Sequence, residues 1–458
     1  MINKLFGKIN YVHIYVKMVK YNRKIKFYGG YMKDRERCLL VAVQLSSEEE
    51  ENDMEELKEL VEAADGVVVS SIIQNKQSID NRYYVGQGKI EEIANYVKEL
   101  EIDTIIFNDE LSGSQIRNIE EVVDAKVIDR TRLILDIFAK RALTKEGQLQ
   151  VELAQLKYSL PRLIGLNNNL SRLGGGIGTR GPGEQKLELD RRRIKEKISD
   201  IQNELNELGK VRETKRKKRM KDQVPIISIV GYTNAGKSTL LNALVESEYS
   251  DEEAENKKVF AEDMLFATLE TELRRVRLPG GRRAVFSDTV GFIKKLPTQI
   301  VEAFKGTLEE IKYADLIIHL IDINDENLQQ HKETTTKLVE KIIDKDIPVL
   351  TVYNKIDKIV SDKITTIPSN DIIYISAKDK FNIDKLLEYV DLKINGEKHK
   401  YLLKIPNKNI KDYYWLFENR YTDNVEFDGE GVNLEAILYE NEKNEYKDYI
   451  KGEVNGSL

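Results

Sequence analysis

The segment from Ile226 to Val245 constrains the fold more than any other part of the sequence. The apolar run 226–230 leads directly into Gly231-Tyr232-Thr233-Asn234-Ala235-Gly236-Lys237-Ser238, which matches the pattern GxxxxGK[ST], and residues 239–245 have the apolar spacing of a helix. In such a loop, glycines let backbone N–H groups surround phosphates, the lysine contacts the β- and γ-phosphates, and the hydroxyl binds Mg²⁺. The sequence therefore predicts a P-loop nucleotide-binding domain of α/β class.

A second motif follows at the end of the next expected strand, 284–286. Asp288-Thr289-Val290-Gly291 has the pattern DxxG. A carboxylate there can reach the Mg²⁺ shell, and the Gly291 amide can contact a γ-phosphate. We expect this motif to sense the third phosphate.

Two further motifs predict that the base is guanine. Asn354-Lys355-Ile356-Asp357 ends the expected strand 349–353, and Ser376-Ala377-Lys378 follows the strand 372–375. The carboxylate of Asp357 can accept two hydrogen bonds from guanine, whereas adenine would leave it unpaired. Four motifs in this order, each at a strand end, predict a GTPase.

Further positions between and beside these motifs bear on metal binding and hydrolysis. Thr268 is the candidate to complete the Mg²⁺ shell in the GTP state, with Thr271 as its rival. Phe292 stands where many GTPases place a glutamine that orients water, so we expect slow intrinsic turnover, with the phenylalanine either packed in the core or retracted on activation. The oxygen of Asn234 either helps to hold a K⁺ ion or only packs the loop.

Outside the nucleotide motifs, two regions have distinct patterns. Strand-like runs at 39–43, 66–72, 104–107 and 126–128 alternate with helical patterns, which predicts a small parallel α/β domain. Leucines and isoleucines at helical spacing then predict two facing helices, joined by a Gly-rich loop over 174–184. The glycines and neighbouring arginines make this loop a candidate RNA probe, against the alternative of a merely mobile loop.

Charge and composition narrow the function classes. Residues 151–222 contain 18 Lys and Arg against 10 Asp and Glu, and residues 1–37 contain 10 against 2, although the whole chain has a formal net charge of -6. Such asymmetry is typical of a polyanion partner, although a solvated charged face gives the same pattern. The single cysteine, Cys38, excludes an intrachain disulfide, and no apolar run approaches the roughly 20 residues of a membrane span. We expect a cytoplasmic protein.

The chain resembles the HflX family of translational GTPases over about residues 39–406. The resemblance rests on 108-NDELS-112, 128-IDRT-131, the 174–184 loop, the P-loop string GYTNAGKSTL, 266-FATL-269 and 288-DTVGFI-293. It implies a GTPase that binds the large ribosomal subunit (50S) and its rRNA and splits stalled ribosomes under stress, and it implies a second activity on ATP. A large-subunit assembly GTPase and an ATP-driven rRNA remodeller remain as alternatives.

The expected organisation is a basic extension over 1–37, an N-terminal α/β domain over 38–146, a helical hairpin over 147–222, a GTPase domain over 223–397 and a small α+β domain over 398–458. The expected GTP-binding residues are Gly231, Tyr232, Thr233, Asn234, Ala235, Gly236, Lys237, Ser238, Thr239, Phe266, Ala267, Thr268, Leu269, Glu270, Asp288, Thr289, Val290, Gly291, Asn354, Lys355, Ile356, Asp357, Ser376, Ala377 and Lys378. Among these, we expect Lys237, Thr268 and Gly291 to be catalytic, Ser238 and Thr268 to bind Mg²⁺, and Asp288 to lie in its outer shell. The candidate RNA contacts are Arg162, Arg172 and Arg180, and we expect a monomer without a membrane span.

Overall fold

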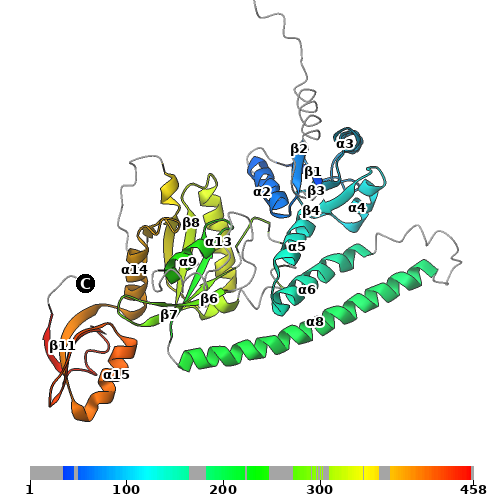
Figure 1. The fold of residues 1–458 in the computed structure, drawn as a ribbon. Helices are drawn as coiled ribbons and strands as arrows, with labels where there is room; N and C mark the ends of the chain where they lie inside the picture. Colours follow the sequence, from blue (N-terminus) through cyan, green and yellow to red (C-terminus); the bar gives the residue numbers. More distant parts are fainter. Residues whose placement is uncertain are drawn as a thin grey trace, which may run out of the picture. The chain divides into compact units, whose positions relative to one another are not determined.

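A computed structural model describes residues 35–45, 50–163, 182–221, 224–246, 272–289, 291–295, 297, 300, 302, 309–343, 345–359 and 372–454. The chain divides into two compact units, the first comprising residues 1–134 and 161–187 and the second residues 135–160 and 188–458. Figure 1 shows their helices and strands.

The first unit contains a four-stranded parallel sheet in the order β2-β1-β3-β4. Its elements are β1 (Arg37–Gln44), α2 (Glu50–Ala63), β2 (Val67–Asn75), α3 (Gln87–Leu100), β3 (Thr104–Phe107), α4 (Gly113–Glu120), β4 (Lys126–Asp129) and the first residues of α5 (Arg130–Arg141). Six consecutive residues of β1 are buried, as expected of a strand covered on both faces. The prediction of a parallel α/β domain is confirmed.

Local sequence explains where the helices of this sheet begin. Ser112 caps α4 by accepting from the Gln115 amide while the Gln115 side chain accepts from the Ser112 amide, which forms a capping box. On α3, residues Ile90, Ile93 and Val97 form one buried face. The loop before it is a turn in which the Gly86 amide donates to the Gln74 side chain.

Two long helices follow, α6 (Lys145–Arg162) and α8 (Pro182–Lys221). Ion pairs join Lys145 to Glu204, Glu152 to Lys197, and Glu146 to Arg212 at 2.9 Å. This order of partners shows that the two helices run antiparallel. The expected apolar seam of α8 lies on its less exposed side, with Ile201 5% exposed. In the part of the chain that the structure describes, no helix combines the length and apolarity that a membrane span requires.

The GTPase domain is built on a six-stranded sheet in the order β10-β9-β8-β5-β7-β6. Its elements are β5 (Ile226–Gly231), α9 (Lys237–Glu246), β6 (Glu272–Arg277), β7 (Arg283–Asp288), η2 (Glu309–Tyr313), β8 (Leu316–Asp322), α13 (Leu328–Ile342), β9 (Val349–Asn354), η3 (Ile356–Lys358), β10 (Ile372–Tyr374) and α14 (Ile383–Asn395). All neighbouring strands are parallel except β6 and β7, which form an antiparallel pair at one edge. The carboxyl ends of the parallel strands therefore meet at one edge of the sheet.

The C-terminal domain is an antiparallel sheet in the order β12-β13-β11-β14 with one helix. Its elements are β11 (Lys398–Pro406), η4 (Asn407–Asn409), α15 (Ile410–Asn419), β12 (Thr422–Phe427), β13 (Gly431–Tyr439) and β14 (Ile450–Glu453). Tyr413 of α15 is buried in its core, whereas Tyr414 and Trp415 are 57% and 43% exposed. Of these three consecutive aromatic residues, only Tyr413 is therefore buried in the core of the domain.

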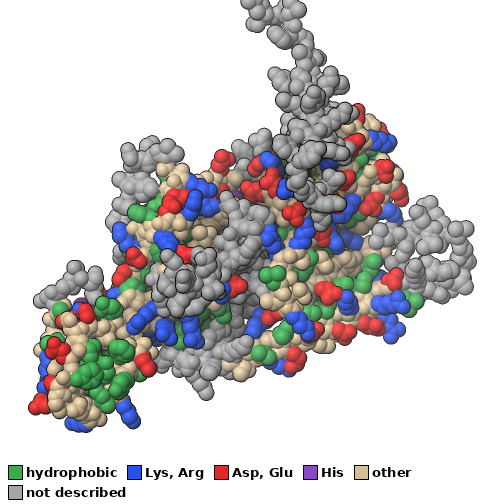
Figure 2. Space-filling model, viewed as in Figure 1, with side chains coloured by type: hydrophobic (Ala, Val, Ile, Leu, Met, Phe, Trp, Pro, Cys, Tyr) green, Lys and Arg blue, Asp and Glu red, His purple; other side chains and the backbone are tan. Residues whose placement is uncertain are grey.

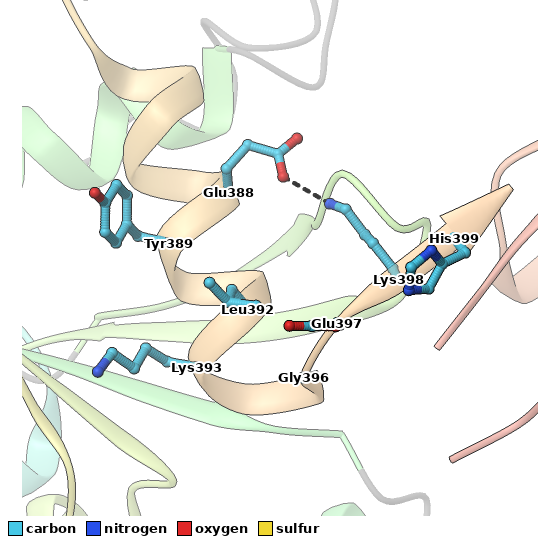
Figure 3. Close-up of a pocket in the computed structure, with 8 residues that line it drawn as sticks. All are labelled: Glu388, Tyr389, Leu392, Lys393, Gly396, Glu397, Lys398 and His399. Atoms are coloured by element: carbon cyan, nitrogen blue, oxygen red, sulfur yellow. Dashed lines mark hydrogen bonds and ion pairs between the residues drawn. The ribbon is translucent and has the colours of Figure 1, made fainter. Parts of the chain in front are cut away.

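A fully buried carboxylate joins the GTPase domain to the C-terminal domain. Asp391 of α14 accepts from the backbone amide of Gly280 at 2.9 Å, from the hydroxyl of Tyr439 at 2.7 Å and from the ammonium of Lys398 at 2.7 Å. Gly280 lies in the β6–β7 turn, and a Cβ atom there would lie 2.1 Å from the Tyr439 hydroxyl, so only glycine fits. Beside this cluster, the turn from α14 into β11 forms a hollow of about 580 Å³, along which Lys398 also binds Glu388 (Figure 3).

Candidate nucleotide-binding site

The P-loop has the strand–loop–helix geometry that the motif requires. It leaves β5 at Gly231 and enters α9 at Lys237. The Lys237 ammonium donates to the carbonyl oxygens of Gly231, at 3.2 Å, and Tyr232, at 2.9 Å. Burial lowers the pKa of Lys237 to about 8, opposed by the nearby charge of Asp288. A phosphate at this position would stabilise the ammonium form.

The donor set beside Lys237 fits a magnesium ion. The Ser238 hydroxyl donates to the Asp288 carboxylate at 2.7 Å, and both side chains are buried. A hydroxyl and a carboxylate are hard oxygen ligands of the kind that Mg²⁺ binds through few protein groups and several waters. Thr268 and Thr271, the candidates for completing this shell, lie outside the described residues.

The predicted base-binding motifs are joined by side-chain hydrogen bonds. Ser376 donates to the Asp357 carboxylate at 2.7 Å, which orients that group. The Asn354 amide group donates to the Ala235 carbonyl at 2.9 Å, and its oxygen accepts from the Ala377 amide at 2.9 Å. Asn354 therefore connects the P-loop to the base pocket.

One residue of this site was missed by the sequence interpretation. Asp322, at the end of β8, forms an ion pair with Lys355 at 3.0 Å, and Lys355 also donates to the Asn234 side-chain oxygen at 3.2 Å. The sequence feature that could have identified Asp322 is a carboxylate at the end of an apolar strand, in 316-LIIHLID-322. The Asn234 oxygen has a lysine partner here, which favours loop packing over K⁺ binding for this residue.

Phe292 packs in the core, which was one of the two expected arrangements. Its side chain is 2% exposed and lies in a cluster with Val230, Ile317 and Val339. An apolar ring held in this way provides no hydrogen bond to a water molecule. Slow intrinsic turnover therefore remains our expectation.

Most predicted GTP-binding residues lie at the carboxyl edge of the sheet or in the loops that leave it. The exceptions are residues that the structure does not describe: Phe266, Ala267, Thr268, Leu269, Glu270 and Val290.

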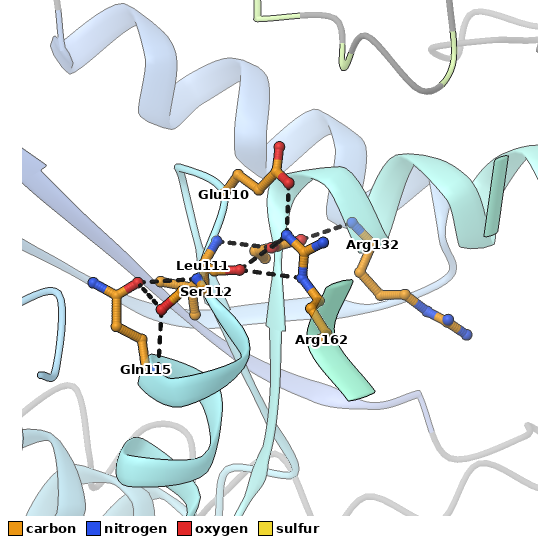
Figure 4. Close-up of polar contacts among 7 residues, drawn as sticks. Glu110, Leu111, Ser112, Gln115, Arg132 and Arg162 are labelled. Carbon is orange, nitrogen blue, oxygen red and sulfur yellow. Dashed lines mark hydrogen bonds and ion pairs between the residues drawn. The ribbon is translucent and has the colours of Figure 1, made fainter. Parts of the chain in front are cut away.

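One candidate RNA contact has partners within the protein. The Arg162 guanidinium binds Glu110 at 2.7 Å, the Leu111 carbonyl at 2.9 Å and Asp129 at 3.5 Å, and its side chain is 11% exposed (Figure 4). These partners favour a structural role for Arg162, and its contact with RNA stays a prediction. Arg172 and Arg180 lie outside the described residues.

Family models match three consecutive parts of the chain. They are described as "GTP-binding GTPase N-terminal" over residues 51–139, "GTP-binding GTPase Middle Region" over 141–219 and "50S ribosome-binding GTPase" over 226–355. A curated relative from Caldanaerobacter subterraneus subsp. tengcongensis, named "GTPase HflX", is 47% identical over 404 residues, which cover 88% of this chain and 91% of the relative. The chain belongs to the HflX family of GTPases.

A second curated relative agrees with this placement. The Escherichia coli protein named "GTPase HflX" is 40% identical and is matched over 81% of this chain and 86% of its own length. A solved structure of a GTP-binding protein from Sulfolobus solfataricus in complex with GDP is 26% identical, with a TM-score of 0.42, over 78% of this chain and 98% of that one. This HflX-family chain is accordingly a GTP hydrolase with a ribosome-binding type of GTPase domain.

Proposed function

We propose that this HflX-family GTPase binds the large ribosomal subunit and uses GTP to split stalled ribosomes under stress. The observation that carries the proposal is the domain over residues 226–355, which matches a "50S ribosome-binding GTPase" model and contains the assembled P-loop site. Mg²⁺ would be held by Ser238 and Thr268, with Asp288 in its outer shell.

The helical hairpin supports a role as the ribosome probe. Helix α8 is 40 residues long, and ion pairs join its residues 197–212 to residues 145–152 of α6. The loop that joins them is rich in glycine and includes Arg172 and Arg180. Arginines at the tip of a stabilised hairpin are suited to contact RNA phosphates, which position a protein without reading sequence.

A contact path links the nucleotide site to the C-terminal domain. Strand β7 ends at Asp288, beside Ser238, and it begins at the turn whose Gly280 amide binds Asp391. Asp391 in turn accepts from Tyr439 of the C-terminal sheet. A displacement of the DxxG motif can therefore be transmitted along β7 to the turn that contacts the C-terminal domain.

The C-terminal domain has an exposed aromatic face. Figure 2 shows hydrophobic side chains gathered on this domain. The aromatic side chains of the domain that are 43–65% exposed are Tyr414, Trp415, Phe417, Tyr421 and Phe427. Such a patch is typical of an interaction surface, and we propose that it lies against the ribosome.

Sedimentation of 70S ribosomes with the protein tests this function. We expect free subunits with GTP or a non-hydrolysable analogue and intact 70S particles with GDP. A protein that binds only immature large subunits and leaves 70S particles intact would instead be an assembly GTPase. Subunit conversion that requires ATP and ignores GTP would favour the RNA remodeller.

The role of the hairpin tip is tested by Arg172→Ala with Arg180→Ala. We expect weaker large-subunit binding at unchanged GTP affinity, and the slope of the salt dependence should fall by roughly 0.7–0.9 for each arginine–phosphate interaction removed. Arg192→Ala with Arg193→Ala is the matched control, because both side chains are 78% exposed on α8 and the charge removed is the same. Equal reductions of binding in both double variants would mean that only the net charge of the hairpin matters.

A further inference from the structure

A tyrosine of the P-loop binds the segment that follows the DxxG motif. The hydroxyl of Tyr232 accepts a hydrogen bond from the backbone amide of Lys294 at 2.7 Å. Next to it, the Thr233 amide donates to the Phe292 carbonyl at 2.8 Å and the Phe292 amide donates to the Gly231 carbonyl at 3.2 Å, as in a short parallel strand pair. The P-loop and residues 292–294 are thus held together by three hydrogen bonds.

A histidine outside all four motifs fixes the ring of this tyrosine. The imidazole of His331, on α13, stacks on the Tyr232 ring with centroids 3.6 Å apart and planes 8° apart. Asp325 holds the imidazole by a contact of 2.5 Å to Nδ1. Both rings are shielded, since Tyr232 is 8% exposed and the His331 side chain 14%.

This arrangement places Gly291 against the residues that surround the γ-phosphate position. A Cβ atom on Gly291 would lie 2.7 Å from Cγ2 of Thr233 and 3.1 Å from Nζ of Lys237. A γ-phosphate that binds both the Lys237 ammonium and the Gly291 amide needs room between these groups, so Gly291 has to move away. Phe292 and Lys294 lie one and three positions after it in the chain, and their bonds to the P-loop resist that movement.

The geometry assigns to Tyr232 and His331 a latch, defined as the His331–Tyr232 stack and the Tyr232–Lys294 hydrogen bond. The latch favours the protein without a γ-phosphate and so lowers the affinity for GTP relative to GDP. Tyr232 and His331 are positioning residues, because they act through the segment 292–294. A ligand that moves Gly291 has to break the hydrogen bond to Lys294 as part of its binding.

The test measures the affinities of GDP and a non-hydrolysable GTP analogue with fluorescent nucleotides. Tyr232→Phe keeps the ring stack and removes only the hydroxyl. We expect the ratio of analogue affinity to GDP affinity to rise roughly two- to tenfold, the effect of one buried hydrogen bond. Tyr389→Phe is the matched control, since Tyr389 is a partly buried tyrosine of α14 in the same domain, and it should leave the ratio unchanged.

A second pair of variants tests the histidine independently. His331→Ala should raise the same ratio, whereas His331→Phe, which keeps an aromatic face, should restore the wild-type value. The double variant Tyr232→Phe with His331→Ala should raise the ratio by less than the product of the two single fold-changes, because both break one latch. The proposal would be overturned if the variants changed the affinities for GDP and for the analogue by the same factor, or if His331→Phe did not restore the wild-type ratio. Both residues would then serve only in packing.

Discussion

The protein contains one parallel and one mostly parallel sheet, whose carboxyl edges are occupied in different ways. In the GTPase domain, that edge carries the P-loop, whose Lys237 ammonium is buried and whose Ser238 hydroxyl lies beside the Asp288 carboxylate. In the N-terminal domain, the corresponding edge is occupied by the protein's own charges. Arg130 binds Asn108 at 3.1 Å and Glu56 at 3.0 Å, and Arg162 binds Asp129.

The difference shows that a carboxyl edge becomes a nucleotide site only when its loops provide donors for a ligand. Ligands bind open α/β sheets at this edge, but the position alone does not create a site. In the N-terminal sheet, the Arg130 and Glu56 side chains are 3% and 8% exposed, so their charges serve the fold. Substitutions at the carboxyl edge of the GTPase sheet should therefore affect ligand binding, and substitutions at that of the N-terminal sheet should affect stability.

The largest effect on nucleotide binding is expected from Lys237→Ala. It removes the charge that contacts the phosphates, so triphosphate affinity should fall by roughly 100-fold or more, the scale of losing one partner of a buried charge pair. Titration with a fluorescent GTP analogue measures this, with Lys385→Ala on the exposed side of α14 as the control. Retained tight binding by Lys237→Ala would show that the P-loop is not the nucleotide site.

At the other edge, Arg130→Met should destabilise the N-terminal domain by about 3–5 kcal/mol, because it leaves the Glu56 carboxylate buried without its arginine. Hydrogen exchange of peptides from β1, β3 and β4 should accelerate, while GTP affinity stays unchanged. Lys98→Met, on the exposed side of α3, removes the same charge as a control. A loss of GTP affinity in Arg130→Met alone would contradict the separation of the two edges.

A smaller effect is expected from pH. Burial lowers the pKa of Lys237 to about 8, and a bound phosphate favours the ammonium form. Nucleotide affinity should therefore be full below pH 8 and should fall by up to about tenfold per pH unit above it, since binding then takes up a proton. Dissociation constants measured from pH 7 to 9.5 that do not change would show that Lys237 stays protonated throughout.

The smallest expected effect concerns the monovalent cation. The side-chain oxygen of Asn234 accepts from Lys355, so we expect equal GTPase rates in potassium and sodium salts. A clear rate increase in potassium that Asn234→Ala abolishes would show that Lys355 yields this oxygen to an ion.

Much of the GTPase site could be predicted from the sequence because its motifs are local. Each lies within a few residues of a strand end, so an apolar run followed by GxxxxGK[ST] or DxxG determines both the element and the group that it presents. The parallel sheet of the N-terminal domain was predicted for the same reason, from apolar runs that alternate with helical patterns.

Contacts between distant segments could not be predicted in this way. Arg162 is the last residue of α6 and precedes a basic loop, yet it binds Asp129, which is 33 positions earlier in the sequence. His331 lies 99 positions after Tyr232, and nothing in a single sequence indicates that their rings stack. Such pairs depend on the packing of whole elements, which local spacing does not encode.

The central claim is that the guanine-binding edge of the GTPase domain drives ribosome splitting. Asp357→Asn tests it most directly, because the carboxylate that Ser376 orients would be replaced by an amide, which pairs with xanthine in place of guanine. We predict that this variant loses 70S splitting with GTP and regains it with xanthosine triphosphate, as measured by gradient sedimentation. Splitting by the variant with GTP at the wild-type level, or no splitting with either nucleotide despite tight xanthosine triphosphate binding, would contradict the account.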